Sequence, residues 1–290
     1  MPETANISDH LPKVVIEVMA LKKLERTIKH LGRTSIAFSG GVDSTLLLRI
    51  ALDSLGESNI MAIMATSPLL PDNETAEASE IAAGFGVRLH LVPADPLALE
   101  AVRQNRPDRC LHCKRHLLGL MLDRAAEEGF ATLVEGTNSS DLGEFRPGIK
   151  ALAEMEGVKS PFIECGITKY EIRKLARSMN LPNWNKPSQA CLATRIPFGT
   201  RLTSQELARV DRAEARLREM GITQVRVRSH GNLARIEVDR QELVSTLIPD
   251  NMQQISETVK SCGFTYVTLD LDGYRSGSMN LTMPVTGGKK

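Results

Sequence analysis

The stretch Ile36-Ala37-Phe38-Ser39-Gly40-Gly41-Val42-Asp43-Ser44-Thr45 decides the fold, because it leads from an apolar strand through two glycines into a helix. Gly40 and Gly41 allow a sharp turn and a close approach of the backbone to a ligand. Unpaired N–H groups at the start of the following helix attract anions. No lysine follows the glycines, which excludes a Walker A loop. The stretch predicts a phosphate-binding loop; the alternative is an ordinary turn with Asp43 or Ser44 as the helix cap.

Apolar strands alternate with amphipathic helices on both sides of this loop. The expected helices are 12–31, 44–52, 73–84 and 112–128, and the expected strands are 34–38, 59–66, 87–92 and 132–135. Alternation at this spacing indicates the α/β class, with a parallel sheet covered by helices on both faces.

The pattern changes after the proline-bounded segment 182–198, whose length is typical of a functional loop. A smaller α+β unit with a mostly antiparallel sheet is expected beyond it, with helices 207–220 and 249–262 and strands 224–228, 234–238 and 266–271. We therefore expect two domains, 1–200 and 201–290. The tail 287–290 is expected to be disordered.

Charge and composition exclude several classes of protein. Lys and Arg (36) balance Asp and Glu (35), and the net charge of +1 gives no reason to expect nucleic acid or membrane as a partner. The first residues do not resemble a secretory signal, and no apolar run is long enough to span a membrane. A cytoplasmic location is expected. Five cysteines then favour thiol or metal chemistry over disulfides.

Three cysteines lie in polar surroundings that suit such chemistry. Cys110 and Cys113 open a helix beside Lys114, a position that is expected to lower the pKa of a thiol. Cys191 lies in the proline-bounded segment. Thiolates are strong nucleophiles and soft metal ligands. A zinc site completed by His112 and a redox dithiol are alternatives. Cys165 and Cys262 are expected to be small core residues.

The Ser-Gly-Gly-x-Asp-Ser string resembles the phosphate loop of the PP-loop superfamily, whose members split ATP into AMP and pyrophosphate. The string Gly136-Thr-Asn-x-x-Asp141 resembles the segment with which these enzymes hold nucleotide and Mg²⁺, although a self-bonded turn is the alternative. The resemblance implies that the phosphates contact Ser39, Gly40, Gly41, Asp43, Ser44 and Thr45. It places Ala65, Thr66 and Ser67 near the adenosine, and Gly136, Thr137 and Asp141 at the nucleotide, with Asp141 on Mg²⁺.

Further motifs narrow the resemblance to the LarE family of ATP-dependent sulfur transferases. They are Arg109-Cys-x-x-Cys-Lys114, Gly-Thr-Asn-x-x-Asp-Leu-Gly, Trp184-x-Lys-Pro with Ala-Cys-Leu-Ala-x-Arg, and Asp272-Gly-Tyr-Arg-Ser-Gly-Ser-Met279. The resemblance implies sulfur transfer to a pyridinium dicarboxylate mononucleotide during assembly of a nickel-pincer cofactor. It also implies an oligomer. Cys110, Cys113 and Cys191 match the form of the family that binds a [4Fe-4S] cluster, and sacrifice of the Cys191 sulfur is the alternative.

Cationic residues complete the expected site. Lys114 or Lys186 would stabilise the departing phosphate charge, and Arg195, Arg226, Arg228 and Lys186 would bind the substrate. Glu237 is a further candidate metal ligand, but charges on an exposed strand face are an equal alternative for the arginines and Glu237. The expected partners are the nucleotide substrate, a sulfide source and a second copy of the chain. Competing hypotheses are a PP-loop tRNA thiolase and a sensor that binds ATP without turnover.

Overall fold

The computed structural model describes residues 13–143, 148–275 and 277–282. These residues form two compact units, each assembled from segments distant in sequence. Unit 1 contains the described residues of 1–66, 73–94 and 114–189, and unit 2 contains those of 67–72, 95–113 and 190–290. The expected boundary near residue 200 stays a prediction about domains. The tail 287–290 lies outside the described residues.

Unit 1 is built on a five-stranded parallel sheet in the order β3-β2-β1-β4-β5. The α/β class expected from the sequence is thereby confirmed. The strands are β1 (Thr34–Ala37), β2 (Ile60–Thr66), β3 (Leu89–Pro93), β4 (Leu133–Val134) and β5 (Val158–Lys159). The strand β2 is buried along nearly its whole length, as expected for a central strand with helices on both faces.

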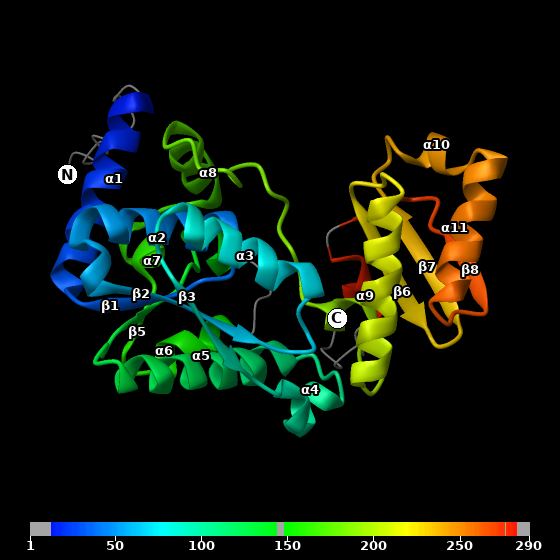
Figure 1. Ribbon diagram of the computed structural model, residues 1–290, viewed down its shortest axis with the longest axis horizontal. Coiled ribbons are helices and arrows are strands. Elements are labelled where there is room, and N and C mark those ends of the chain that lie inside the picture. Colours follow the sequence, from blue (N-terminus) through cyan, green and yellow to red (C-terminus); the bar gives the residue numbers. More distant parts are fainter. Residues whose placement is uncertain (1–12, 144–147, 276, 283–290) are drawn as a thin grey trace, which may run out of the picture. The chain divides into compact units, whose positions relative to one another are not determined.

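Helices cover both faces of this sheet (Figure 1). One face carries α1 (Lys13–Leu31), α2 (Val42–Leu55), α3 (Asp72–Gly84), α7 (Pro161–Cys165) and α8 (Lys169–Ser178), and the other carries α5 (Arg109–Glu127) and α6 (Ile149–Glu154). An apolar cluster that includes Ile63, Met121 and Leu133 fills the space between α5 and the sheet. The helix α5 begins three residues earlier than the sequence predicts, so both Cys110 and Cys113 are helical.

The segment between β4 and the proline-bounded loop contains elements that the sequence pattern did not suggest, among them α8. Thr168 caps α8: its hydroxyl accepts from the Glu171 N–H, and the Glu171 carboxylate accepts from the Thr168 N–H. This Thr-x-x-Glu capping box is a recognisable start signal for a helix. It is the signal from which α8 was predictable.

Unit 2 contains a three-stranded sheet in the order β6-β7-β8, formed by β6 (Val225–His230), β7 (Leu233–Val238) and β8 (Tyr266–Leu269). Strands β6 and β7 are antiparallel, but β7 and β8 are parallel. The expectation of a mostly antiparallel sheet is therefore wrong. The reason is the intervening helix α11 (Pro249–Ser261), because a crossover helix returns the chain to the same end of the sheet.

The core of unit 2 joins its sheet to helix α9 (Ser204–Glu219) and to a single helical turn, Leu192–Arg195. Val225, Val227 and Ile236 from the strands pack with Leu207 and Leu217 from α9. Unit 2 also contains the short helices α4 (Glu100–Arg103) and α10 (Leu243–Thr246). Among the described residues of the whole chain, no helix combines the length and apolar character needed to cross a membrane.

Candidate functional site

The strand order of unit 1 reverses direction at β1, between its neighbours β2 and β4. In open parallel sheets, ligands bind at the carboxyl ends of the strands where the order reverses. The glycine loop follows β1, and Gly136 to Asp141 follow β4. The two loops touch, because a Cβ added to Gly136 would lie 3.1 Å from Asp43 Cβ and 3.4 Å from the Ser44 nitrogen. Two separate sequence motifs thus meet at the position expected of a ligand site.

The glycine loop has the geometry of an anion site. Gly40 has a φ of +68°, and a Cβ there would lie 3.0 Å from both Cα and Cβ of Ala78 in α3. Gly41 is the N-cap residue of α2, and the helix has no side-chain cap hydrogen bond. The alternative, that Asp43 or Ser44 caps this helix, is therefore wrong. The N–H groups in the first turn of α2 can therefore bind a phosphate, and the positive end of the helix dipole favours its negative charge.

The hydroxyl groups of the loop are arranged around Ser44. Its Oγ lies 3.2 Å from the Ser39 Oγ, accepts from the Ser39 N–H, and donates to the Gly41 carbonyl at 3.1 Å. Thr45 is completely buried, and its Oγ1 accepts from the Asn183 amide at 2.9 Å. Ser39 and Ser44 are therefore placed on the loop itself, whereas the Thr45 hydroxyl helps to hold the loop in place.

Asn183 is a site residue that sequence reasoning missed. It is 7% exposed and lies in the proline-bounded segment. Its amide donates to the Gly40 carbonyl at 2.8 Å as well as to Thr45. One buried side chain, distant in sequence, thus links Gly40 of the turn to Thr45 of α2. Only its place in a long polar segment hinted at a functional role.

At the end of β4, Glu135 organises a buried polar network. Lys114 Nζ donates to the Glu135 carboxylate and to Thr137 Oγ1, each at 2.8 Å. Thr137 donates to the same carboxylate through its N–H (3.1 Å) and its hydroxyl (2.6 Å), and Ser160 also donates to it. The predicted residues Lys114 and Thr137 are thereby brought together. Their common partner, Glu135, was quoted in the sequence motif without a role.

Two carboxylates meet beside the loop. Asp43 Oδ1 is buried and lacks a hydrogen-bond partner among the described residues, whereas Oδ2 accepts from Lys169. Burial raises the pKa of Asp43; Lys169 counteracts this effect, and the nearby charge of Asp141 adds to it. Asp141 is 8% exposed, and its Oδ2 accepts from the Asn138 N–H at 3.0 Å. A buried, unpartnered carboxylate oxygen next to a second carboxylate suits a hard cation such as Mg²⁺.

The other nucleotide residues predicted for unit 1 occupy varied positions. Ala65 is buried in the core against α5, and Thr66 ends β2, where its carbonyl accepts from Ala94. Ser67 follows directly and begins the segment 67–72, which belongs to unit 2. Lys186 Nζ donates to Glu77 at 2.7 Å and to Glu74 at 3.3 Å. Burial acts against the charge of Lys186, but these two carboxylates outweigh it and raise its pKa.

The three predicted thiols lie in unit 2, and Cys191 is close enough to affect the pKa values of the other two. Burial raises the pKa of Cys113 to about 12, with further upward contributions from Cys191 and Cys110. Burial also raises the pKa of Cys110, although that residue keeps exposed surface. The predicted lowering of these pKa values is therefore wrong. The nearby protein removes water from the thiols, and the Lys114 ammonium is bonded to Glu135 and Thr137 instead.

Next to Cys110 in the sequence, the Arg109 guanidinium has nitrogen atoms without hydrogen-bond partners among the described residues. Arg109 is 4% exposed and stacks on Phe198, 4.3 Å from the ring centre. Its Nε and Nη1 are buried without hydrogen-bond partners among the described residues. No group of three or more His, Cys, Asp or Glu side chains in the described part of the chain is already arranged around a metal position. The site therefore offers soft ligands and unused donors for an anion, but no preformed metal geometry.

Arg195 holds the backbone on which Cys191 lies. The side chain is completely buried, and Nε and Nη2 bond Glu214 of α9 at 2.8 and 2.9 Å. Nη1 donates to the carbonyls of Ala190 and Cys191 at 2.6 and 3.2 Å. The visible contacts of Arg195 are therefore structural, and its contact with substrate stays a prediction.

Two arginines of the unit 2 hairpin, Arg226 and Arg228, are buried. Arg226 and Arg228 are 3% and 4% exposed, so the alternative of solvated charges on an open strand face is wrong. Burial lowers the pKa of Arg226 to about 10, and Arg195 adds to this shift. Arg228 bonds Glu237 at 2.7 Å and Ser278 at 3.1 Å. Glu237 is also bonded by Arg235 and Ser278, so its contacts are to cations and a hydroxyl. The Asp272–Met279 motif reaches this cluster through Ser278.

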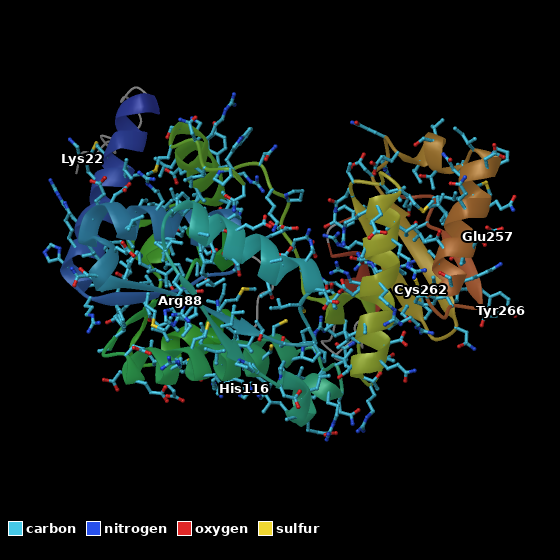
Figure 2. All side chains as sticks on the ribbon, viewed as in Figure 1. Lys22, Arg88, His116, Glu257, Cys262 and Tyr266 are labelled. Atoms are coloured by element: carbon cyan, nitrogen blue, oxygen red, sulfur yellow. The ribbon has the colours of Figure 1, made fainter. Side chains whose placement is uncertain are left out.

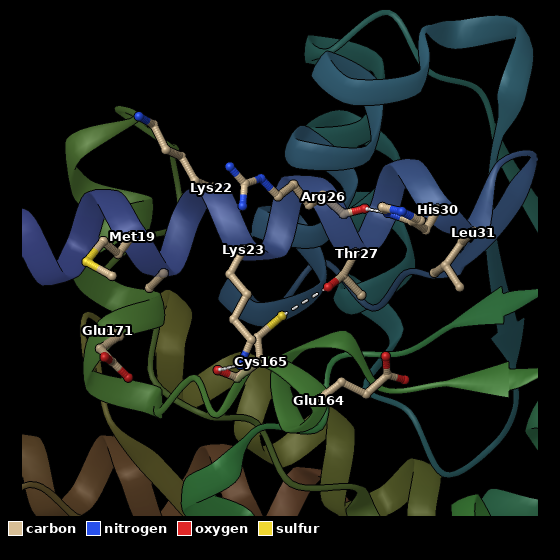
Figure 3. A pocket seen from close by; sticks show the side chains of 11 residues that line it. Met19, Lys22, Lys23, Arg26, Thr27, His30, Leu31, Glu164, Cys165 and Glu171 are labelled. Carbon is tan, nitrogen blue, oxygen red and sulfur yellow. Dashed lines mark hydrogen bonds between the residues drawn. The ribbon is translucent and has the colours of Figure 1, made fainter. Parts of the chain in front are cut away.

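The remaining cysteines lie elsewhere. Cys262 is buried at the end of α11, as predicted (Figure 2). Cys165 is only partly buried, and its Sγ lies 3.4 Å from Thr27 Oγ1 of α1. It lines an open groove of about 850 Å³ beside α1 (Figure 3). None of the residues predicted to bind nucleotide or substrate lines this groove, so it is separate from the site at β1 and β4.

Comparisons with known proteins now identify the family. No protein-family model matches the chain. An uncharacterised protein of Synechocystis is 40% identical over 90% of this chain and 96% of its own length. A glutamine-hydrolysing GMP synthase component of Archaeoglobus fulgidus is 28% identical over 62% of the chain and 58% of its own length.

The pyridinium-3,5-bisthiocarboxylic acid mononucleotide synthase of Lactiplantibacillus plantarum is 38% identical over 91% of this chain and 96% of its own length. Identity at this level along nearly the full length of both proteins, together with the PP-loop fold and the glycine loop at its switch point, shows common family membership. The chain belongs to the LarE family of ATP-dependent sulfur-transferring enzymes.

Proposed function

We propose that this enzyme adenylates a carboxylate of a pyridinium-3,5-dicarboxylate mononucleotide and replaces one carboxylate oxygen with sulfur, for assembly of a nickel-pincer cofactor. The observation that carries the proposal is the coexistence of an uncapped glycine loop and three neighbouring thiols in a chain 38% identical to a bisthiocarboxylic acid mononucleotide synthase. The first feature serves activation by ATP, and the second serves sulfur delivery.

Activation uses the residues of unit 1. A substrate carboxylate oxygen attacks the α-phosphorus of ATP, the bond to the bridging oxygen breaks, and pyrophosphate leaves with the electron pair. The first-turn N–H groups of α2, with Ser39 and Ser44, would hold the pyrophosphate. Lys114, which is fixed by Glu135 and Thr137, would add positive charge. Asp43 and Asp141 would hold Mg²⁺, which neutralises phosphate charge when bound.

Sulfur insertion follows from the chemistry of the acyl-adenylate. A sulfur nucleophile attacks the activated carbonyl, the carbon–oxygen bond to AMP breaks, and a thiocarboxylate forms. Attack on the free carboxylate would require loss of oxide, whereas AMP is a good leaving group. The activation step therefore has to precede sulfur transfer, and each oxygen replaced consumes one ATP.

We propose that Cys110, Cys113 and Cys191 hold a [4Fe-4S] cluster that supplies sulfide without consumption of a protein sulfur. Three thiols would leave one iron without a protein ligand. Their soft sulfur donors suit such a group, although the described residues are not already arranged around a metal position. The raised pKa values describe the metal-free thiols, and metal coordination deprotonates a thiol outright. Sacrifice of the Cys191 sulfur is the alternative.

The buried arginines of unit 2 would bind the substrate phosphate. Burial, followed by the charge of Arg195, lowers the pKa of Arg226 although Glu214 counteracts them, and a bound anion would favour its charged form. Arg228 presents an unpartnered buried Nε among the described residues. We propose that both contact the phosphate, that Arg195 positions Cys191, and that Lys186 contacts substrate only after it releases Glu77.

The test is a turnover assay with the purified protein, ATP, Mg²⁺ and pyridinium-3,5-dicarboxylate mononucleotide. AMP, pyrophosphate and a product heavier by the exchange of oxygen for sulfur are expected in equal amounts. ATP binding without AMP formation would leave only the sensor hypothesis. Thiolation of tRNA, with no reaction of the mononucleotide, would favour the tRNA thiolase instead. The near-zero net charge of the chain argues against that outcome.

The sulfur source is tested with anaerobically purified protein. A brown protein with a charge-transfer absorbance that disappears in Cys110→Ser, Cys113→Ser and Cys191→Ser supports the cluster. The matched controls Cys165→Ser and Cys262→Ser should keep that absorbance. A colourless protein that turns over once, and then lacks the mass of one H₂S at Cys191, would establish sacrifice of that residue.

A further inference from the structure

The two oxygens of the Asp43 carboxylate are used differently. Oδ2 accepts a hydrogen bond from the Lys169 ammonium, and Oδ1 is buried with no partner among the described residues. A buried carboxylate oxygen without a partner is costly, so it is either strained or reserved for a ligand. Asp43 lies in the first turn of α2, directly at the phosphate loop. The free oxygen is therefore at the place where a cation on ATP would need it.

Lys169 is anchored to the segment that carries the second carboxylate. Its backbone N–H donates to Ser140 Oγ at 3.0 Å, and Ser140 precedes Asp141. The capping box of Thr168 and Glu171 fixes the first turn of α8, where Lys169 lies. Lys169 thus begins α8 with its backbone bonded to the loop after β4, and its ammonium reaches Asp43 after β1. The ion pair joins the two halves of the ligand site.

The Lys169–Asp43 ion pair is exposed enough to solvent for a metal ion to replace the ammonium. The side chains of Lys169 and Asp43 are 28% and 25% exposed, in contrast to the completely buried Arg195–Glu214 pair of unit 2. An ammonium carries one charge and its stem is flexible, whereas a divalent cation carries two and needs several oxygens. The Lys169 ammonium and a divalent cation cannot both bind Asp43 tightly, because like charges at this distance repel each other.

We propose that Lys169 is a competitor of the divalent cation at Asp43: it neutralises this carboxylate in the metal-free protein and is displaced when the metal binds. The inference rests on the proposed Mg²⁺ site at Asp43 and Asp141 and extends it to a residue outside the metal's ligands. Lys169 thereby sets the metal concentration at which the site fills. It also keeps the carboxylates from holding a cation tightly when no nucleotide is present.

The test measures Mn²⁺ binding to the full-length protein without nucleotide, by electron paramagnetic resonance of the free ion. Lys169→Met should bind Mn²⁺ about tenfold more tightly than the wild type, since a unit positive charge a few ångströms from the metal is removed. Asp43→Asn should abolish this binding in both backgrounds. The control Lys29→Met removes an exposed lysine from α1 and should leave the affinity within about twofold.

The sign of the change decides the result. A lysine that only supports the fold would weaken metal binding when removed, so unchanged or weaker Mn²⁺ binding by Lys169→Met overturns the proposal. Mn²⁺ binding that survives Asp43→Asn also overturns it. The melting temperature gives a second readout, with Lys169→Gln as a second variant: added Mn²⁺ should raise it more in both variants than in the wild type. Failure of the turnover assay would instead reject the proposed function, since neither metal measurement involves nucleotide.

Discussion

At the scale of single residues, Gly40 shows why the loop needs glycine. Its φ of +68° disfavours any other residue, and a Cβ would also press on Ala78 at 3.0 Å. Positive φ is shared by many glycines of the chain, so the backbone conformation alone does not distinguish this one. What Gly40 has in addition is the close approach of the α3 backbone at Ala78.

Gly40→Ala is therefore expected to do more harm than a comparable substitution at a glycine with open surroundings. Gly56 has a φ of +76° and no atom within 4 Å of an added Cβ, so Gly56→Ala measures the backbone strain alone. We expect Gly40→Ala to lower the free energy of unfolding by about 1–2 kcal/mol more than Gly56→Ala. Urea titrations measure the difference. Equal losses would show that α3 yields to the added methyl group.

Asn183 gives a second prediction at this scale. Asn183→Ala removes both donors that hold Gly40 and Thr45, and leaves the buried Gly40 carbonyl without this partner. The affinity for ATP should fall by about tenfold, which corresponds to one or two hydrogen bonds. Isothermal titration with ATP measures the effect.

Asn59→Ala is the matched control, because its amide donates to a single carbonyl, Leu55, on the exposed surface. That variant should bind ATP like the wild type. If Asn183→Ala also binds ATP like the wild type, the loop keeps its conformation without the amide, and our account of Asn183 is mistaken.

At the scale of elements, α9 and the turn at 192–195 are joined by the buried Arg195–Glu214 pair. Burial opposes the ionisation of Glu214, but Arg195 outweighs it, and the pKa of Glu214 is lowered. A lowered carboxyl pKa stabilises the fold at neutral pH, and this contribution is lost as the pH falls through the folded-state pKa. The Val227 N–H also donates to Glu214, so the carboxylate joins three elements.

Arg195→Met should lower the free energy of unfolding by about 3–5 kcal/mol at neutral pH, because a buried carboxylate loses its main partner. Arg195→Met with Glu214→Leu should recover part of that loss. The exposed pair of Arg49 and Asp53 is the control, and Arg49→Met should cost less than about 1 kcal/mol. Alkylation of Cys191 should quicken in both variants that lack Arg195, but not in Arg49→Met. An unchanged rate would show that the loop is held by other contacts, such as that of Leu192 with Leu69.

At the scale of the whole molecule, the residues that we propose for activation and for sulfur transfer fall in different units. The predicted nucleotide residues lie in unit 1 apart from Ser67, whereas the three thiols lie in unit 2. The oligomer and the cytoplasmic location that we expect from the sequence both stay predictions.

The two half-reactions should therefore separate by mutation. Cys113→Ser should exchange pyrophosphate into ATP, with the mononucleotide present, within about twofold of the wild-type rate, while thiocarboxylate formation falls by about a hundredfold or more. Asp43→Asn should lose both. Radiolabelled pyrophosphate and mass spectrometry follow the two steps. Loss of exchange in the cysteine variant would contradict the separation, provided that its melting temperature is unchanged.

Much of the molecule followed from the sequence by itself. Apolar periodicity and the Ser39–Ser44 loop predicted the parallel α/β sheet and its phosphate loop, because strand period, helix period and glycine turns are local properties. The motifs also indicated the LarE family, which the full-length relatives then showed. That Cys110, Cys113 and Cys191 act as a set stays a prediction.

Tertiary structure decided what depends on contacts between distant segments. Three such features cannot be predicted from neighbouring residues in the sequence. They are the ion pair of Lys169 with Asp43, the hydrogen bond from Asn183 to Gly40 and the burial of Arg226. The same holds for the thiols, whose local helix position predicted a lowered pKa, whereas surrounding protein raises it. The sequence thus determined which chemical groups this enzyme carries, and the fold decided which of them are desolvated, paired or left with an unused atom. Desolvation and pairing depend on neighbours in space, and residue order along the chain does not reveal them.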